Sequence, residues 1–206
     1  MELIFQENVP SVYGSSFIAS VKDYCRSLNI DPNWLMAVMY FETAGTFSAS
    51  IRNPFSNATG LIQFMPNTAL SLGTSIDELA LMTAEEQLYY VYQYYYPYRN
   101  RMNSYVDLYL ATFFPVAMGK ASNYVLQTSN LSASTIADAN PVFDLNNDRQ
   151  ITVGEITKLI TNKIPQAWRN YFLGSSSGGI AKKKSWIPKV FGISLLGYIA
   201  YKIVAT

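Results

Sequence analysis

Glu42 is the one charged residue in a stretch that is otherwise apolar and helical, and such a carboxyl group can serve as an acid. Every residue from position 34 to 41 is apolar or aromatic, and Leu35, Val38 and Met39 share a helix face with Glu42. Burial raises the pKa of a carboxyl group. This is how a fold keeps a general acid protonated near neutral pH. We therefore expect Glu42 to move a proton in a reaction, rather than to be a solvated charge at a helix end.

The composition removes most other catalytic chemistry. The 206 residues include no histidine and a single cysteine, Cys25. Ser-His and Cys-His nucleophilic pairs, histidine-ligated metals, intrachain disulfides and cysteine zinc clusters are therefore excluded. Cys25 shares helical spacing with apolar neighbours and is expected in the core. What remains is carboxylate chemistry, which suits the cleavage of glycosidic bonds, and it requires no cofactor.

A string of short motifs follows Glu42 in register: Glu42-Thr43, Ser56-Asn57-Ala58-Thr59-Gly60-Leu61-Ile62-Gln63, Met65-Pro66 and Thr68-Ala69. The string resembles the signature of the lytic transglycosylases of the lysozyme-like superfamily, and the resemblance covers roughly residues 30–120. It implies a goose-type, or SLT, helical domain that acts on peptidoglycan glycan strands. It also implies that Glu42 is the catalytic acid and base, that Ser56 orients the carboxyl and the substrate N-acetyl group, and that Gln63 and Met65 line the sugar cleft.

The resemblance implies cleavage of the β-1,4 bond between N-acetylmuramic acid and N-acetylglucosamine, with a 1,6-anhydro product. A conventional glycosidase would need a second carboxylate, about 5–5.5 Å from the first when retaining and about 6.5–9.5 Å when inverting. Asp77 and Asp107 are the nearest candidates, and nothing in the sequence distinguishes them from surface charges. A lysozyme-type hydrolase of the same fold therefore remains an alternative.

Two positions depart from the family pattern. Thr43 stands where the family usually has serine, although it keeps a hydroxyl. Phe113 stands where a later family motif has a tyrosine whose hydroxyl points at the acid, so that hydroxyl is either absent or supplied by another tyrosine. A second alternative follows, in which the chain is a non-enzymatic virion membrane or assembly protein on a lysozyme-like scaffold.

Helix signals recur along the chain, and no segment alternates β-branched with polar residues, so we expect a mainly α fold. Helices are predicted over 16–28, from Asp31-Pro32 to Glu42, after Pro66 until a break at 73–75, from the Thr83 capping box to Tyr96, and over 104–114. Together these form one domain, residues 1–174.

Residues 144–155 match an EF-hand loop at most positions and are called the EF-hand-like loop below. Oxygen ligands for a structural Ca²⁺ are expected from the side chains at loop positions 1, 3, 5 and 12 and from position 7, that is from Asp144, Asn146, Asp148, Gln150 and Glu155. Arg149 stands at position 6, where the turn normally requires glycine. Thr152 and Glu155 also form a capping box. Calcium binding and a purely structural turn are the two interpretations.

The C-terminal part has a different composition. All acidic residues lie within 1–174, whereas the last 32 residues contain five lysines and no acid. Residues 175–185 predict a flexible basic linker, and residues 186–205 predict a transmembrane anchor of the ~20 residues that span a bilayer. An interfacial helix, or one docked on a partner, is the alternative. The mildly acidic body argues against a nucleic-acid partner.

Residues 1–14 show no signal-peptide pattern, and the lysine cluster lies on the domain side of the anchor. The body is therefore expected to face the cytoplasm of the cell that makes the protein. This topology suits a bacteriophage enzyme held in a membrane inside the virion, with lipid and other virion proteins as partners, that opens the cell wall locally during entry.

We expect the full-length chain to partition into membranes and to resist extraction by alkaline carbonate. Burying about ten large apolar side chains in lipid gains roughly 1.5–3 kcal/mol each, which exceeds the cost of two lysines near the ends. Residues 1–174 should stay in the supernatant in the same fractionation. Release of the full-length chain by carbonate would instead indicate an interfacial or partner-docked tail.

Overall fold

Side-chain caps mark the helix starts, and the computed structural model has helices where these caps predict them. Thr83 and Thr152 each form a complete capping box with the glutamate three residues later. The Ser104 hydroxyl accepts a hydrogen bond from the backbone N–H of Asp107 at 3.0 Å. Local sequence therefore fixes where these helices begin.

The structure describes residues 2–173, and this part of the chain is mainly α, as predicted. It has isolated β-bridges but no strand. The α-helices are α1 (Gly14–Leu28), α2 (Pro32–Glu42), α3 (Pro66–Ser71), α4 (Ile76–Leu81), α5 (Ala84–Tyr95), α6 (Tyr105–Phe113), α7 (Ala133–Ala139), α8 (Val153–Asn162) and α9 (Gln166–Phe172). Short 3-10 helices are η1 (Gln6–Asn8), η2 (Ser11–Tyr13), η3 (Tyr96–Tyr98), η4 (Pro115–Ala117) and η5 (Pro141–Phe143).

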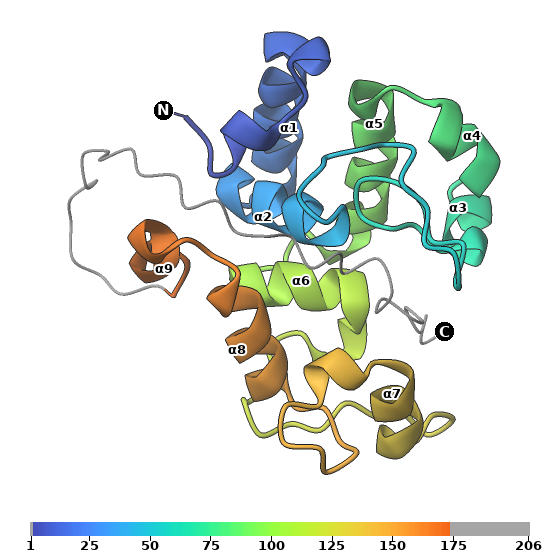
Figure 1. Cartoon of the computed structure of the whole chain (residues 1–206), viewed down its shortest axis with the longest axis vertical. Coiled ribbons are helices and arrows are strands. Elements are labelled where there is room, and N and C mark those ends of the chain that lie inside the picture. Colours follow the sequence, from blue (N-terminus) through green and yellow to red (C-terminus); the bar gives the residue numbers. More distant parts are fainter. Residues whose placement is uncertain (1, 174–206) are drawn as a thin grey trace.

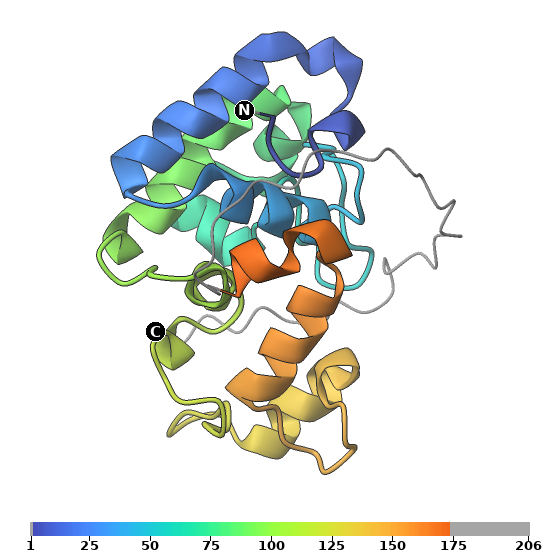
Figure 2. The same ribbon diagram turned by 90° about the vertical axis from the view of Figure 1, so that its left-hand side faces the viewer.

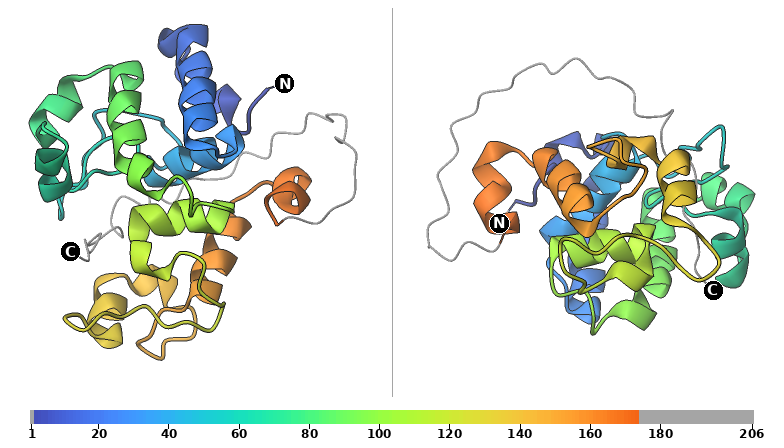
Figure 3. Two further views of the ribbon diagram at one scale, coloured as in Figure 1. Left: turned by 180° about the vertical axis from the view of Figure 1, so that it is seen from behind. Right: turned by 90° about the horizontal axis from the view of Figure 1, so that it is seen from below.

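Helix α2 lies in the middle of the molecule (Figures 1 and 2). Helix α1 packs against both α5 and α2, and α6 packs against α2 from another side. Seen from behind, α5 runs beside α1 and ends above α6 (Figure 3). Helices α3 and α4 pack on each other beside α5, while α7, η5 and α8 form the opposite end of the molecule and contact α6 through α8.

Apolar spacing explains this packing. The buried residues of α1 are Phe17, Val21, Cys25 and Leu28, which recur every three or four positions along one face. Helix α2 has no polar face, and its residues from Leu35 to Met39 are at most 2% exposed. A helix that is apolar all round needs neighbours on every side. The elements around α2 supply them, and the predicted core position of Cys25 is confirmed.

The sequence reading missed three helices. The predicted break at 73–75 is confirmed, because it separates α3 from α4, but the capping box of Ser75 with Glu78 that starts α4 was not predicted. Helices α7 and α9 were not predicted either. No helix within residues 2–173 is long and apolar enough to cross a membrane. The predicted linker, 175–185, and the predicted anchor, 186–205, lie outside the described residues.

Candidate active site

The start of α2 is fixed by its first residues. The Asp31 carboxylate accepts a hydrogen bond from the backbone N–H of Asn33 at 2.8 Å. Pro32 takes the first helical position, where a missing N–H costs nothing. The Tyr171 hydroxyl donates a hydrogen bond to the other carboxylate oxygen of Asp31, so α9 is attached to the start of α2. These contacts fix where α2 begins, and Glu42 is the last residue of this helix.

The end of α2 is fixed by Thr43. Its hydroxyl donates to the carbonyl oxygen of Met39 at 2.7 Å and accepts from the backbone N–H of Phe47 at 2.9 Å. Thr43 is fully buried, so its hydroxyl serves to end the helix and begin the next loop. Glu42, the residue before it, is 4% exposed. The sequence prediction that this carboxyl group lies inside the protein is confirmed.

The negative charge on Glu42 acts on four tyrosines, of which Tyr95, Tyr105 and Tyr109 are buried and Tyr94 is partly buried. Tyr94 and Tyr95 come from α5, and Tyr105 and Tyr109 come from α6. In all four, burial is the main cause that raises the pKa of the phenol, and the negative charge on Glu42 raises it further. These hydroxyl groups therefore stay protonated near neutral pH and can act as hydrogen-bond donors.

Three of these hydroxyl groups, those of Tyr94, Tyr95 and Tyr105, differ in their hydrogen bonding. Tyr94 donates to the carbonyl oxygen of Ala111 at 2.8 Å, and Tyr95 forms a hydrogen bond with the hydroxyl of Thr112. The hydroxyl oxygen of Tyr105 is buried and has no hydrogen-bond partner within residues 2–173. Buried hydroxyl groups are normally paired. The Tyr105 hydroxyl is therefore available to donate a hydrogen bond.

Phe113 packs against the rings of Phe143 and Tyr109. Its ring lies 4.8 Å from the ring of Phe143 in η5 and 6.1 Å from that of Tyr109. The Tyr109 ring also makes an edge contact with Phe41, the residue before Glu42, at 5.4 Å. Helix α6 thus brings phenol groups to the surroundings of Glu42 from positions one and two turns before Phe113. The sequence analysis did not single out Tyr105 or Tyr109, because neither falls on the position at which the family motif has its tyrosine.

The other predicted site residues share the loop between α2 and α3. Gln63 is 3% exposed, and its amide nitrogen donates to the carbonyl oxygens of Gly60 at 3.1 Å and Ile51 at 3.3 Å. The Ser56 hydroxyl is half-buried and accepts from the backbone N–H of Ala58 at 3.3 Å. Met65 is half-buried and occupies the N-cap position of α3 without a side-chain hydrogen bond. The nitrogen of Gln63 thus holds the loop together, while Ser56 and Met65 keep partly exposed side chains.

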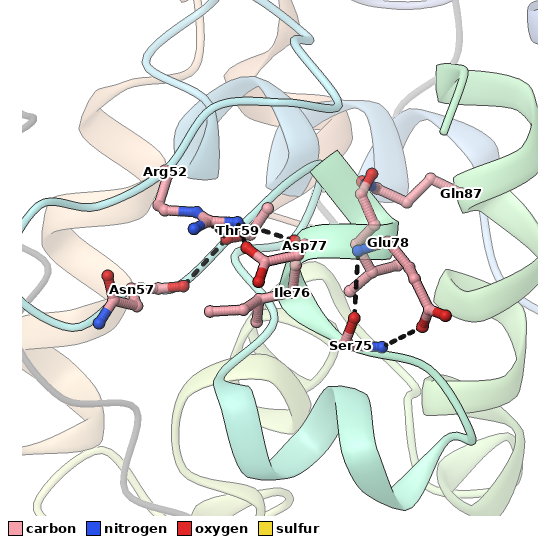
Figure 4. A network of polar contacts seen from close by, with 9 residues as sticks. Arg52, Asn57, Thr59, Ser75, Ile76, Asp77, Glu78 and Gln87 are labelled. Atoms are coloured by element: carbon pink, nitrogen blue, oxygen red, sulfur yellow. Dashed lines mark hydrogen bonds and ion pairs between the residues drawn. The ribbon is translucent and has the colours of Figure 1, made fainter. Parts of the chain in front are cut away.

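A polar network ties this loop to α4 (Figure 4). The Arg52 guanidinium donates to the Thr59 hydroxyl at 3.1 Å and to the carbonyl oxygen of Ile76 at 3.0 Å. It also forms an ion pair with Asp77 at 2.8 Å, in which the Asp77 side chain is 80% exposed. Asp77, one of the two candidate second acids, therefore pairs with Arg52 on the surface.

Asp107, the other candidate, is occupied at the start of α6. One carboxylate oxygen accepts from the Ser104 hydroxyl at 2.9 Å, and the other accepts from the backbone N–H of Gly119 at 2.9 Å. A carboxylate with both oxygens bound in this way stabilises the fold rather than attacking a substrate. Neither candidate therefore offers a second catalytic carboxylate.

The EF-hand-like loop folds around its own backbone N–H groups. The Asp144 carboxylate accepts from the N–H groups of Asp148 at 3.1 Å and Arg149 at 2.9 Å, and Glu155 closes the capping box with Thr152. Within residues 2–173, no group of three acidic, cysteine or histidine side chains is placed to hold a metal ion. Glu155 already reaches the loop, because its other carboxylate oxygen accepts from the backbone N–H of Leu145 at 3.0 Å. Calcium binding would therefore require Glu155 to exchange these hydrogen bonds for the ion.

Arg149 shows how the loop tolerates a residue other than glycine at its sixth position. Its φ is 62°, in the left-handed region that the turn requires and that a β-carbon strains. Its guanidinium group forms an exposed ion pair with Asp138 of α7. The positive charge of Arg149 is thus paired with a carboxylate outside the loop. The side-chain oxygen atoms of Asn146 and Asp148 are of the type that binds Ca²⁺.

No family model, curated protein or solved structure matches this chain. Its function must therefore be inferred from its own residues and their contacts.

Calcium at millimolar concentration is expected to raise the melting temperature modestly, because an ion that binds only the folded state stabilises it. Glu155→Gln should abolish this rise yet melt near the wild type in chelator, since glutamine also serves in a capping box. Thermal unfolding with and without chelator measures both effects. Identical wild-type curves in the two conditions would show that the loop is a structural turn.

Tyr105→Phe is expected to raise the free energy of unfolding by about 1 kcal/mol, because it removes a buried hydroxyl that lacks a partner. Tyr94→Phe is the control and should be destabilising, since the Tyr94 hydroxyl is bonded to Ala111. Denaturant unfolding provides the comparison. A loss of stability in Tyr105→Phe would show that its hydroxyl is bonded in solution. If Tyr105 assists Glu42, the more stable variant should also have lower enzymatic activity.

Proposed function

We propose that this chain is a peptidoglycan lytic transglycosylase with a lysozyme-like helical domain, in which Glu42 acts as both acid and base. The observation that carries the proposal is the position of Glu42, 4% exposed at the end of an apolar helix and close to four protonated phenol groups. The ordered motifs from Glu42 to Ala69 support the same assignment.

In the proposed reaction Glu42 first donates its proton to the glycosidic oxygen between N-acetylmuramic acid and N-acetylglucosamine. The bond from that oxygen to the anomeric carbon breaks, and positive charge develops on the muramic ring. The Glu42 carboxylate then takes the proton from the C6 hydroxyl of the same ring as its oxygen bonds to the anomeric carbon. The product carries a 1,6-anhydro end, and Glu42 returns to its protonated state.

One carboxylate is enough for this mechanism, and the surroundings of the two alternative acids favour it. Asp77 is paired with Arg52, and Asp107 accepts hydrogen bonds on both oxygens. A two-carboxylate hydrolase would need a second acid free to hold water or to attack the sugar. Lysozyme-type hydrolysis remains the nearest alternative, and the chemistry of the product ends distinguishes the two.

The buried tyrosines bear on the alternative of a non-enzymatic scaffold. That alternative rested on Phe113, which lacks the hydroxyl found in the family motif. Tyr105 and Tyr109 supply phenol groups near Glu42 from the same helix as Phe113. Their hydroxyl groups can stabilise the carboxylate that forms when Glu42 gives up its proton, because a bond to the charged form favours that form.

We further propose that the enzyme is attached by residues 186–205 to the inner membrane of a phage virion and acts on the host wall during entry. The support is the sequence pattern of residues 175–205, with its basic linker and apolar segment. Glycan strands, lipid and other virion proteins are the partners that this placement implies.

Mass spectrometry of purified murein after incubation with residues 1–174, and with the full-length chain in detergent, tests the function. We expect 1,6-anhydro ends from the wild type. Glu42→Gln should lose activity by about 10²–10⁴-fold or more, because glutamine is nearly isosteric and transfers no proton. Glu7→Gln, an exposed site, is the matched control and should retain full activity.

Each alternative gives a different result. Reducing ends in place of anhydro ends would identify a hydrolase. Intact murein after incubation with a folded wild-type chain would favour the non-enzymatic scaffold. A Glu42→Gln variant that retains more than about a tenth of the wild-type rate would exclude Glu42 as the group that moves the proton.

A further inference from the structure

Gln87 on α5 is fully buried, and its amide group joins three segments of the chain. The amide nitrogen donates to the carbonyl oxygen of Ala49 at 3.0 Å and to that of Leu79 in α4 at 2.9 Å. The amide oxygen accepts from the backbone N–H of Leu61 at 2.6 Å. All three partners are backbone groups, so this one side chain satisfies two carbonyl groups and one N–H group that would otherwise be buried without bonds.

The loop approaches Gln87 so closely that the adjoining position has room only for glycine. A β-carbon built on Gly60 would lie 2.2 Å from the amide oxygen of Gln87, and the three atoms it would meet first all belong to Gln87. The φ of Gly60 is 84°, which glycine adopts without strain. Because three hydrogen bonds hold the amide group of Gln87 in place, moving it aside for a β-carbon at position 60 would break these bonds.

The bonds of Gln87 extend to the predicted substrate residues. Gly60 and Leu61 belong to the same turn as Gln63, whose amide nitrogen donates to the carbonyl oxygen of Gly60 at 3.1 Å. Figure 4 shows Gln87 reaching from α5 toward α4 and this loop. Helix α5 packs on α1, and α1 packs on α2, which carries Glu42. A continuous series of packing contacts and hydrogen bonds therefore runs from α2, which carries Glu42, through α1, α5 and Gln87 to the loop.

We propose that Gln87 is a positioning residue that holds the 49–63 loop in register with Glu42, a role that rests on the function proposed above. Gln87 touches neither the acid nor the sugar. Its amide sets where Gly60 and Leu61 lie and hence where the partly exposed side chains of Ser56 and Met65 would meet a glycan strand. Misplacing groups that orient a substrate slows the reaction, and a shift of about 1 Å can cost roughly 10²-fold.

The kinetic test uses the full-length chain with Gln87→Met, which keeps the size of the side chain and removes its three hydrogen bonds. The matched control is Gln93→Met, the same change at an exposed position on the same helix. We expect Gln87→Met to remain folded at the assay temperature and to lose about tenfold or more in kcat/KM, mostly in kcat. Wild-type kcat and KM in a folded Gln87→Met chain would overturn the proposal.

A double-mutant cycle tests the contact without relying on activity. Gly60→Ala should lower the melting temperature of the wild type more than it lowers that of Gln87→Ala, by at least about 3 °C. The left-handed strain at position 60 is the same in both backgrounds and cancels. Equal losses would show that Gln87 does not confine the loop and would overturn the proposal.

Hydrogen exchange of the wild type covers the case in which the Gln87 variants fail to fold. The backbone N–H of Leu61 has the Gln87 oxygen as its partner and should exchange as slowly as N–H groups within α5. Rapid exchange at Leu61 would overturn the proposal. If the wild type leaves murein intact, the proposed enzymatic function is wrong. The double-mutant cycle and the exchange rate of Leu61 still test whether Gln87 holds the loop, because neither measurement depends on activity.

Discussion

The fold depends on burying one helix, α2, that has no polar side and ends in a carboxyl group. Residues 35–39 are at most 2% exposed, with α1 and α6 packed against the helix, and the polar groups at both helix ends must find partners inside the protein. Asp31 provides the partner at the start, and Thr43 provides it at the end. Once these ends are fixed, Glu42 can only lie where the surrounding helices meet.

The neighbours of Glu42 follow from this constraint. A region that must cover an acid and still admit hydrogen bonds suits tyrosine, which combines a large apolar ring with one hydroxyl. Helices α5 and α6 each bring two tyrosines to it. The rings of Phe41, Tyr109, Phe113 and Phe143 then continue as a chain of aromatic contacts toward η5. These aromatic contacts therefore connect α2, from the residue before Glu42, through α6 to η5.

Sequence patterns predicted the parts of the structure that are fixed by near neighbours. The Asp31-Pro32 start, the apolar run before Glu42, and the capping boxes at Thr83 and Thr152 each depend on residues within four positions, and each is confirmed. The capping box at Ser75 follows the same local rule, but the glycine at position 73 suggested a break and concealed it. The mainly α class followed from the same local signals.

Contacts between distant residues could not be predicted in this way. Nothing in the sequence near Gln87 indicates that its amide bonds residues 26 and 38 positions away, because the partners are backbone groups with no side-chain signature. Tyr105 and Tyr109 were also not predicted, because the family motif matches at Phe113, and only the packing of α6 shows which of its tyrosines are affected by Glu42. The pairing of Arg149 with Asp138, 11 positions earlier, likewise depends on how α7 packs beside the EF-hand-like loop.

The two kinds of contact have different consequences for the candidate site. Local rules place Glu42 at the end of α2, and they would do so in many arrangements of the surrounding helices. Only the distant contacts bring the tyrosines of α5 and α6 into the field of that carboxyl group and tie the 49–63 loop to α4 and α5. Helix α9 adds one more such contact, because Tyr171 bonds Asp31 at the other end of α2, and burial, together with Asp31, raises the pKa of Tyr171 to about 12. The start of α2 is thus held both by the local cap of Asp31 on Asn33 and by a hydrogen bond from a residue 140 positions away.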